Sequence, residues 1–214
     1  MITFVRGLLA AALTALPLLT ATPTHAAEVT LRDAIDALPV ADESRTGYER
    51  SAFRHWVDAD GDGCTTRSEV LLAESVGPLT TTGRCKITGG RWVSYYDRVE
   101  VTDPRKLDID HLVPLAEAWD SGASRWSAAR RQAYANDLTA DRSLVAVTAR
   151  TNRSKADQDP TTWMPPAAQA RCTYIEDWTA TKTRWDLKVD ADEKNKLVKE
   201  AATCPDSPLD IPRA

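Results

Sequence analysis

One segment near the middle of the chain, residues 107–115 (LDIDHLVPL), combines an apolar strand pattern with two carboxylates and a histidine. Charged groups inside an apolar strand are costly unless they are paired or used, so such a segment must lie against partners or at a site. Alternation along a strand places Asp108 and Asp110 on one face and His111 on the other. For Asp110 and His111 to serve one site, the strand must end or bulge near His111, and Pro114 favours an end there.

A second short apolar strand, 144–148 (LVAVT), follows about thirty residues later and leads directly into a helix expected over 149–157. Asn152 and Lys155 are three residues apart, so they share one face of that helix. The order is therefore a strand with Asp-His, a loop, a strand, and a helix with Asn-x-x-Lys.

The rest of the chain predicts an α+β fold, a mostly helical single domain with a small antiparallel element in the middle. A β-hairpin is expected over 80–100, with Gly89-Gly90 as its turn. No internal repeat or low-complexity linker divides the chain. Further helices are expected over 29–39, 47–57, about 68–74, 124–136, about 167–185 and about 190–202.

Residues 1–26 have the composition of a secretory signal peptide, with Arg6, an apolar run over 7–19, and small residues near Ala26. The apolar run is about half as long as a membrane-spanning helix needs to be. We therefore expect cleavage near Ala26, secretion of a mature domain over 27–214, and no association with membranes.

The charge balance is acidic. The formal net charge is −4, and removal of the expected signal peptide takes away Arg6 and no acid, which leaves −5. This balance argues against a protein that coats nucleic acid through its overall charge. It does not exclude an enzyme that meets phosphates through a local basic patch and a bound cation.

Four cysteines remain in the mature chain, and an even number in an exported protein indicates disulfides. Three pairings are possible, and the sequence order favours Cys64–Cys85 and Cys172–Cys204. A zinc site is disfavoured because no CxxC spacing exists.

The segments DIDHLVPLAEAW, RSLVAVTARTNRSKADQDPTTW and GCTTRSEVL resemble those of HNH nucleases, also called His-Me finger nucleases, which have a ββα-metal core. The closer resemblance is to secreted bacterial HNH endonucleases and to the C-terminal nuclease domain of GmrSD-type restriction endonucleases. It covers most of residues 48–200 and implies a ββα-metal core over about 105–163.

The resemblance implies a general base at His111 and a single Mg²⁺ or Mn²⁺ ion held by Asp110 and Asn152. The middle Asn of the HNH pattern is replaced by Ser143, whose hydroxyl could still orient a neighbour. The residues expected to support the ligands or to contact the substrate are Asp108, Ser143, Arg153, Lys155 and Arg67.

The chemistry of these residue types agrees with the implied roles. Carboxylate and amide oxygens suit Mg²⁺, and a cation near the scissile phosphate stabilises the charge that grows during displacement. An imidazole with an ordinary pKa near 6.5 is mostly neutral at pH 7–8 and can accept a proton. Arg153 and Lys155 could hold flanking phosphates.

A second metal site is suggested by residues 58–69, which match the EF-hand loop spacing. Gly63 stands at the sixth position, and acids stand at positions 1, 3, 5 and 12. Cys64 falls inside the loop, so a purely structural turn is the alternative to Ca²⁺ binding. The candidate calcium ligands are Asp58, Asp60, Asp62 and Glu69.

The sequence thus predicts an extracellular, metal-dependent, HNH-type endonuclease that hydrolyses phosphodiester bonds in DNA. A monomer is favoured, but the oligomeric state is not determined by the sequence. Two alternatives stay open. One is a ribonuclease that uses the same residues, and the other is a catalytically silent, calcium-binding extracellular module. Strandedness, base preference and the preferred metal are not determined by these patterns.

Overall fold

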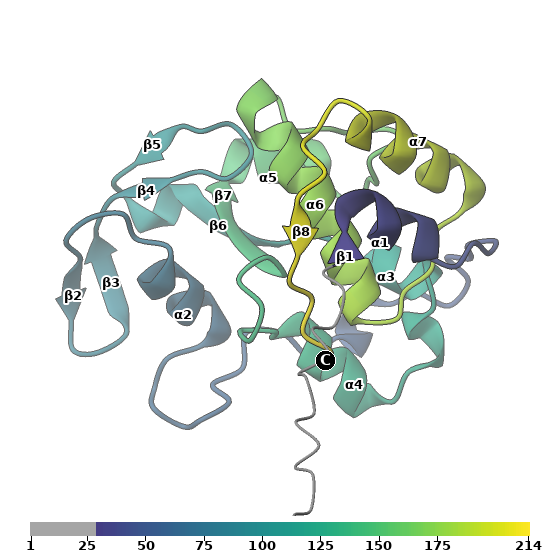
Figure 1. Cartoon of the computed structure of the whole chain (residues 1–214). Coiled ribbons are helices and arrows are strands. Elements are labelled where there is room, and N and C mark those ends of the chain that lie inside the picture. The colour runs from purple at the N-terminus through teal and green to yellow at the C-terminus, as the bar shows by residue number, and fades with distance from the viewer. Residues whose placement is uncertain (1–28) are drawn as a thin grey trace, which may run out of the picture.

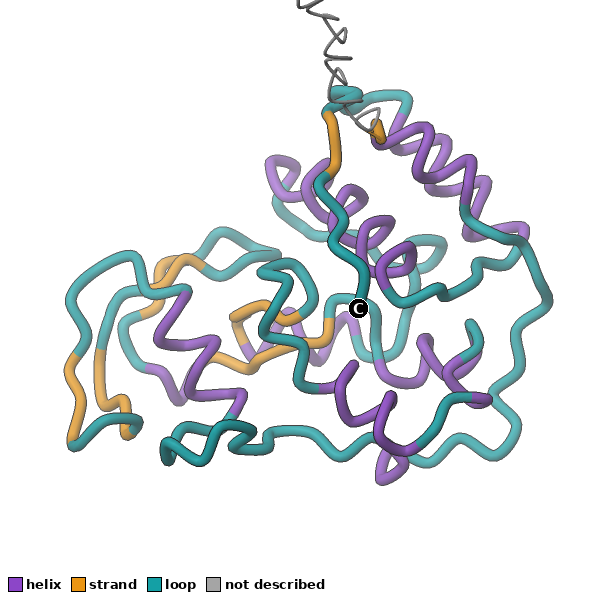
Figure 2. Tube along the Cα trace, turned by 60° about the horizontal axis from the view of Figure 1, so that its bottom comes forward, coloured by secondary structure: helices purple, strands orange, loops and turns teal. Residues whose placement is uncertain are grey.

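The computed structural model describes residues 29–214, and the expected signal peptide lies outside them. Helices and loops make up most of the trace, and the strands are short (Figure 2). Within the described residues, no helix is both long and apolar enough to cross a membrane. The helices are α1 (Leu31–Ala37), α2 (Thr66–Ala73), α3 (Leu115–Asp120), α4 (Ala128–Ala135), α5 (Ala149–Lys155), α6 (Ala168–Arg184) and α7 (Ala191–Ala201). The strands are β1 (Val29–Thr30), β2 (Thr80–Thr82), β3 (Lys86–Gly89), β4 (Trp92–Val93), β5 (Glu100–Val101), β6 (Leu107–His111), β7 (Leu144–Thr148) and β8 (Pro208–Leu209).

Strands β6 and β7 pair antiparallel at the centre of the molecule (Figure 1). Their register runs regularly from Leu107 opposite Thr148 to His111 opposite Leu144. β6 therefore ends at His111 without a bulge. The other strands form three further two-stranded pairs, β1–β8, β2–β3 and β4–β5, among the described residues.

The β6–β7 pair has a hydrophobic core on each face, because alternate side chains point to opposite sides. Val145 and Val147 belong to the larger core, which includes residues of α1, α3, α6 and α7. Leu144 and Ala146 belong to a smaller core with Trp92 and residues of α2. Figure 1 shows the helices of the larger core on one side of the pair, and α2 with the β2–β3 hairpin on the other.

Helix α5 begins where β7 ends because Thr148 is both the last strand residue and the helix N-cap. The Thr148 side chain accepts a hydrogen bond from the backbone N–H of Thr151, which satisfies one of the free donors of the first turn. The helix ends at Lys155, and Ala156 follows with a positive φ of 49°. This tight connection holds α5 against both strands.

The helix predicted over 47–57 is wrong. Only the 3₁₀ turn Arg50–Ala52 forms there. The side chain of Asn136 holds the following chain extended, accepting from the N–H of Val57 at 3.1 Å and donating to the carbonyl of Arg54 at 2.7 Å. This long-range contact overrides local helix propensity.

The predicted turn at Gly89-Gly90 is also wrong. Gly89 is the last residue of β3, and the β2–β3 turn contains Gly83, which has a φ of +66°. A Cβ on Gly90 would lie 2.4 Å from the Trp92 ring and 2.8 Å from Leu79. Gly90 is therefore required for close packing rather than for reversing the chain. The helices predicted near 29–39, 68–74, 124–136, 149–157, 167–185 and 190–202 and the two strands of the central pair are confirmed, with small shifts at their ends.

The cysteines form the two disulfides that the sequence order favours. Cys64–Cys85 ties the segment before α2 to the turn before β3, and Cys172–Cys204 ties α6 to the end of α7. Each bridge closes a loop of a few tens of residues and is expected to add roughly 2–4 kcal/mol to stability.

A buried cluster of charges joins α3, α6 and α7. The ammonium of Lys182 is fully buried and lies 2.7 Å from Glu117 and 2.6 Å from Glu193. A third acid, Glu43, lies 3.9 Å from the same ammonium. Burial, and the charge of Glu117, raise the pKa of Glu43 to about 8 against the opposing charge of Lys182. Burial likewise raises the pKa of Glu193 to about 7.

We predict that Glu43→Gln reduces the loss of stability at alkaline pH. A carboxyl whose pKa is raised on folding keeps a proton that the unfolded chain has lost, so its contribution declines as pH rises from about 4.5 to about 8. The glutamine side chain of the variant does not titrate, so this contribution to the pH dependence is removed. Urea unfolding between pH 5.5 and 8.5 should show a shallower decline than in the wild type. Asp36→Asn, an exposed change on α1, serves as the control and should keep the wild-type decline. Equal declines in Glu43→Gln and the wild type would contradict the prediction.

Candidate active site

The two acids of β6 face helix α5. Asp108 accepts a hydrogen bond at 3.1 Å from the side-chain amide of Asn152, and Asp110 accepts one at 2.7 Å from Lys155. Both partners come from the helix face on which Asn152 and Lys155 were expected to lie. The strand and the helix thus meet through two polar side-chain pairs.

Asp110 is held by two donors on one of its oxygens. Its Oδ2 accepts from the Tyr96 hydroxyl at 2.6 Å and from the Lys155 ammonium at 2.7 Å. Burial raises the pKa of Asp110, and Lys155 opposes that rise. Its other oxygen, Oδ1, has no hydrogen-bond partner among residues 29–214 and remains free to bind a further group.

Lys155 is fully buried, and its ammonium also donates to the backbone carbonyl of His111 at 3.2 Å. The expectation that Lys155 grips a flanking phosphate is therefore wrong, because the ammonium is enclosed and already paired. It is the internal counter-ion of Asp110 instead.

His111 lies on the other face of β6 from the two acids, between Trp56 on one side and Tyr134 and Ala135 on the other. The ring is 4% exposed and lies beside Trp56, with ring centroids 5.4 Å apart. Burial lowers the pKa of His111 to about 3, so the imidazole is neutral at pH 7. Its Nε2 lies 3.0 Å from the carbonyl oxygen of Ala135. A carbonyl only accepts, so Nε2 carries the hydrogen and Nδ1 keeps a free lone pair.

A pocket of about 310 Å³ gathers Asp110, His111 and Asn152, because β6 ends there and α5 passes beside it. We call it the site pocket. Arg50, Arg153 and Asp157 also line it. The carbamoyl oxygen of Asn152 makes no hydrogen bond to any residue of the described chain. Two residues that line the pocket, Asp110 and Asn152, thus each have a side-chain oxygen without a hydrogen-bond partner among residues 29–214, and Mg²⁺ prefers such hard oxygen ligands.

Residues 74–200 match the family described as GmrSD restriction endonucleases, C-terminal domain, and the match covers more than half of the chain. The chain belongs to this family. It is also 41% identical over 158 residues to an uncharacterized secreted protein of the fungus Arthroderma benhamiae, with 74% of this chain and 76% of the relative covered. The bacterial origin implied by the sequence resemblance finds no support in this fungal relative. No solved structure matches the chain.

Two other residues that were predicted to act at the site, Ser143 and Arg67, lie outside the site pocket. Ser143 donates at 2.9 Å to Asp137, which is also paired with Arg184, and makes no hydrogen bond to His111. Arg67 donates to the carbonyls of Pro104 and Leu107, so it fastens α2 to the start of β6 and does not line the pocket. The neighbour that Ser143 orients is thus Asp137, and the expected cleft role of Arg67 is wrong.

Three groups at the site were missed from the sequence: Tyr96, the carbonyl of Ala135, and Arg50. Each comes from a segment distant in sequence from β6 and contacts Asp110, contacts His111 or lines the pocket. No local pattern points to such partners. His55 was not predicted to be a site residue, but its ring centroid lies 6.2 Å from that of His111.

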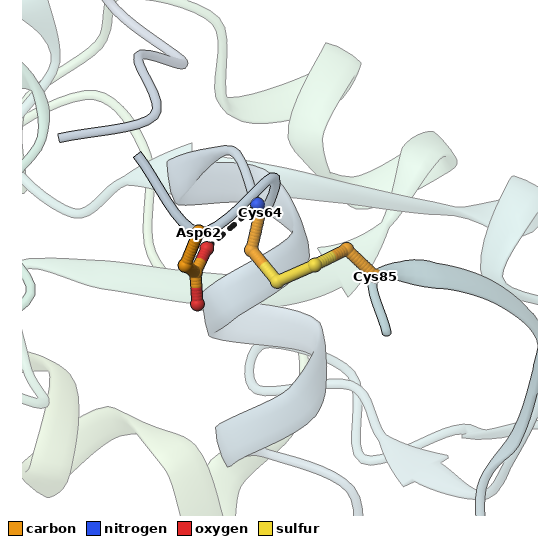
Figure 3. A group of neighbouring side chains, drawn as sticks. All are labelled: Asp62, Cys64 and Cys85. Carbon is orange, nitrogen blue, oxygen red and sulfur yellow. Dashed lines mark hydrogen bonds between the residues drawn. A yellow bond between two sulfur atoms is a disulfide. The ribbon is translucent and has the colours of Figure 1, made fainter. Parts of the chain in front are cut away.

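The loop over residues 58–69 brings only three of the four predicted calcium ligands close together. Carboxylate oxygens of Asp58, Asp60 and Asp62 lie within 4.8 Å of one another, and Glu69 is not among them. Figure 3 shows the Asp62 carboxylate turned toward the N–H of Cys64, beside the disulfide to Cys85. Calcium binding here stays a prediction, which calorimetric titration of the wild type and of Asp60→Asn with Ca²⁺ tests.

We predict that Lys155→Met lowers the free energy of unfolding by roughly 3–5 kcal/mol, because it leaves the buried Asp110 without its counter-ion. Arg153→Met removes an exposed cation from the same helix and should change stability by less than about 0.5 kcal/mol. Urea unfolding in EDTA compares the two. Similar midpoints for both variants would show that Lys155 does not have this role.

Proposed function

We propose that the protein is an extracellular, divalent-metal-dependent endonuclease that hydrolyses phosphodiester bonds, with DNA as its expected substrate. The observation that carries the proposal is the gathering of Asp110, His111 and Asn152 around one pocket at the end of a strand–strand–helix unit. Membership of the GmrSD C-terminal domain family supports a nuclease activity. The order of strand, strand and helix agrees with the HNH type.

His111 is the proposed proton acceptor. The Ala135 carbonyl fixes the hydrogen on Nε2 and so directs the lone pair of Nδ1 away from that contact. A neutral imidazole in this tautomer can take a proton from water that attacks the phosphorus. The surrounding rings of Trp56 and Tyr134 hold the imidazole in place. Ala135 thus has the orienting role that the middle residue of the HNH pattern was expected to have.

Asp110 and Asn152 are the proposed ligands of one Mg²⁺ or Mn²⁺ ion. When bound, such an ion stabilises the negative charge that grows on the phosphate oxygens. Asp110 would offer Oδ1, since Lys155 and Tyr96 hold Oδ2. The Asn152 amide is turned by its bond to Asp108, which leaves the carbamoyl oxygen for the ion. Asp108 therefore supports a ligand and is not one itself.

Secretion is part of the proposal. The fungal relative is described as a secreted protein, and the two disulfides suit an oxidising environment. The amino-terminal segment, with the expected cleavage near Ala26, agrees with export.

Cleavage of supercoiled plasmid by the purified mature protein tests the function. We expect nicking with Mg²⁺ or Mn²⁺, and none in EDTA. His111→Ala should slow it by roughly 10²–10⁴-fold through loss of the proton acceptor. Asn152→Ala should raise the metal concentration needed for half-maximal cutting.

Lys199→Ala, an exposed change on α7, is the matched control and should cut like the wild type. Absence of cutting by the wild type, or equal cutting by His111→Ala in a folded protein, would refute the proposal. The same assay with RNA separates a deoxyribonuclease from a ribonuclease. A protein that binds Ca²⁺ tightly and cuts neither polymer would instead be the silent calcium-binding module.

A further inference from the structure

A second pocket adjoins the site pocket on the other side of Arg153. It measures about 640 Å³ and lies between β5, the start of β6 and the start of α5. Arg153 lines both pockets. Asp108 lines the second and Asn152 the first, and these two side chains are hydrogen-bonded to each other. The two hollows are therefore neighbours separated by one arginine and one polar pair.

The cations of the second pocket are largely uncompensated. Within residues 29–214, Lys106, Arg150 and Arg153 are exposed and enter neither an ion pair nor a side-chain hydrogen bond. Arg50, which lines the site pocket and not the second pocket, is also exposed and enters no ion pair within residues 29–214. We call Arg50, Lys106, Arg150 and Arg153 the basic groove.

Three acids near the basic groove are already in ion pairs, whereas Asp108 accepts a hydrogen bond from the neutral amide of Asn152. Asp103 pairs with Arg105 at 2.9 Å, and Glu100 pairs with Arg91 at 3.4 Å. Asp157, in the site pocket, lies 3.7 Å from Arg45. A set of free cations in a chain of net charge −4 therefore forms a local positive surface beside the proposed reaction centre.

We propose that the basic groove binds the sugar–phosphate backbone of a nucleic-acid strand and leads it across the site pocket. Lys106, Arg150 and Arg153 hold phosphates on one side of the scissile bond, and Arg50 holds the strand on the other. This inference rests on the proposed function, since it concerns the polymer that the same site would cut.

The composition of the groove indicates binding without base preference. Its second pocket is lined by cations, by threonines, by small apolar residues and by the carboxylates of Glu100, Asp103 and Asp108, and no aromatic side chain lines it. Base stacking needs an aromatic face, and reading of adenine or cytosine needs a free amide or carboxylate. Here Glu100 and Asp103 are ion-paired, and Asp108 is bound to Asn152. Lysine and arginine contact phosphates, which carry no sequence information, but they can also read guanine, so comparison of two unrelated sequences tests the absence of base preference.

The test is binding rather than cutting. Fluorescence anisotropy in EDTA measures the Kd of the mature protein for labelled twenty-nucleotide DNA of two unrelated sequences, as single strands and as duplexes, and for RNA of the same sequences. For every polymer that binds the wild type, the double variant Lys106→Ala/Arg150→Ala should have a higher Kd. The increase should be the same factor for both sequences. On duplex DNA its slope of log Kd against log salt should fall by about 2. Lys199→Ala removes one exposed cation from α7 and should keep the wild-type Kd and slope.

The outcomes separate the two proposals. Either of two outcomes overturns the proposed role of the basic groove, even if plasmid is cut. In the first, the wild type binds none of these polymers. In the second, the double variant has the same Kd and slope as the Lys199→Ala control. A loss that differs strongly between the two sequences also overturns it, because it would indicate base reading. If the wild type binds nucleic acid but never cuts it, and the double variant loses this binding, the basic groove is supported and the nuclease activity is refuted. The DNA and RNA arms identify which polymer the groove takes.

Discussion

The ion pair between Lys155 and Asp110 joins the end of helix α5 to the carboxyl-terminal end of strand β6. The ammonium reaches Asp110 and the carbonyl of His111 together, so one buried side chain sets the position of both residues. Tyr96 completes the set from a third segment. An exposed pair of this kind would contribute little, but a buried one tolerates only a narrow geometry because a displaced charge has no water to receive it. The placement of Asn152, one turn earlier on the same helix, follows from that constraint.

The central unit was predictable because its signals are local. The strand 144–148 and the helix that begins at Ala149 follow from apolar residues and from a threonine cap, and the structure places both where the pattern indicated. The alternation that separates Asp108 and Asp110 from His111 is a property of any strand. The disulfide pairs also followed from order along the chain.

The failures share a physical cause, which is contact between segments distant in the sequence. Residues 47–57 have reasonable helix propensity, yet Asn136 holds them extended through two backbone contacts. Gly90 resembles a turn residue, but the Trp92 ring occupies the space that a side chain would need. Lys155 was expected to hold a flanking phosphate, and only the fold reveals that it is buried against Asp110. Lys106 and Arg150 did carry a local signal, since each lies next to a strand of the central unit, but their shared pocket depends on the pairing of the strands.

The two disulfides lie on opposite sides of the β6–β7 pair, and neither crosses it. Cys64–Cys85 lies on the side of the smaller core, and Cys172–Cys204 on the side of the larger one. The covalent cross-links thus restrain the outer layers, while the site between them is maintained by strand pairing and by the Lys155 contacts. Reduction of the two disulfides would loosen the outer layers that they cross-link and not the central strand pair. The oxidation state of the cysteines and the geometry of the site pocket are therefore largely independent.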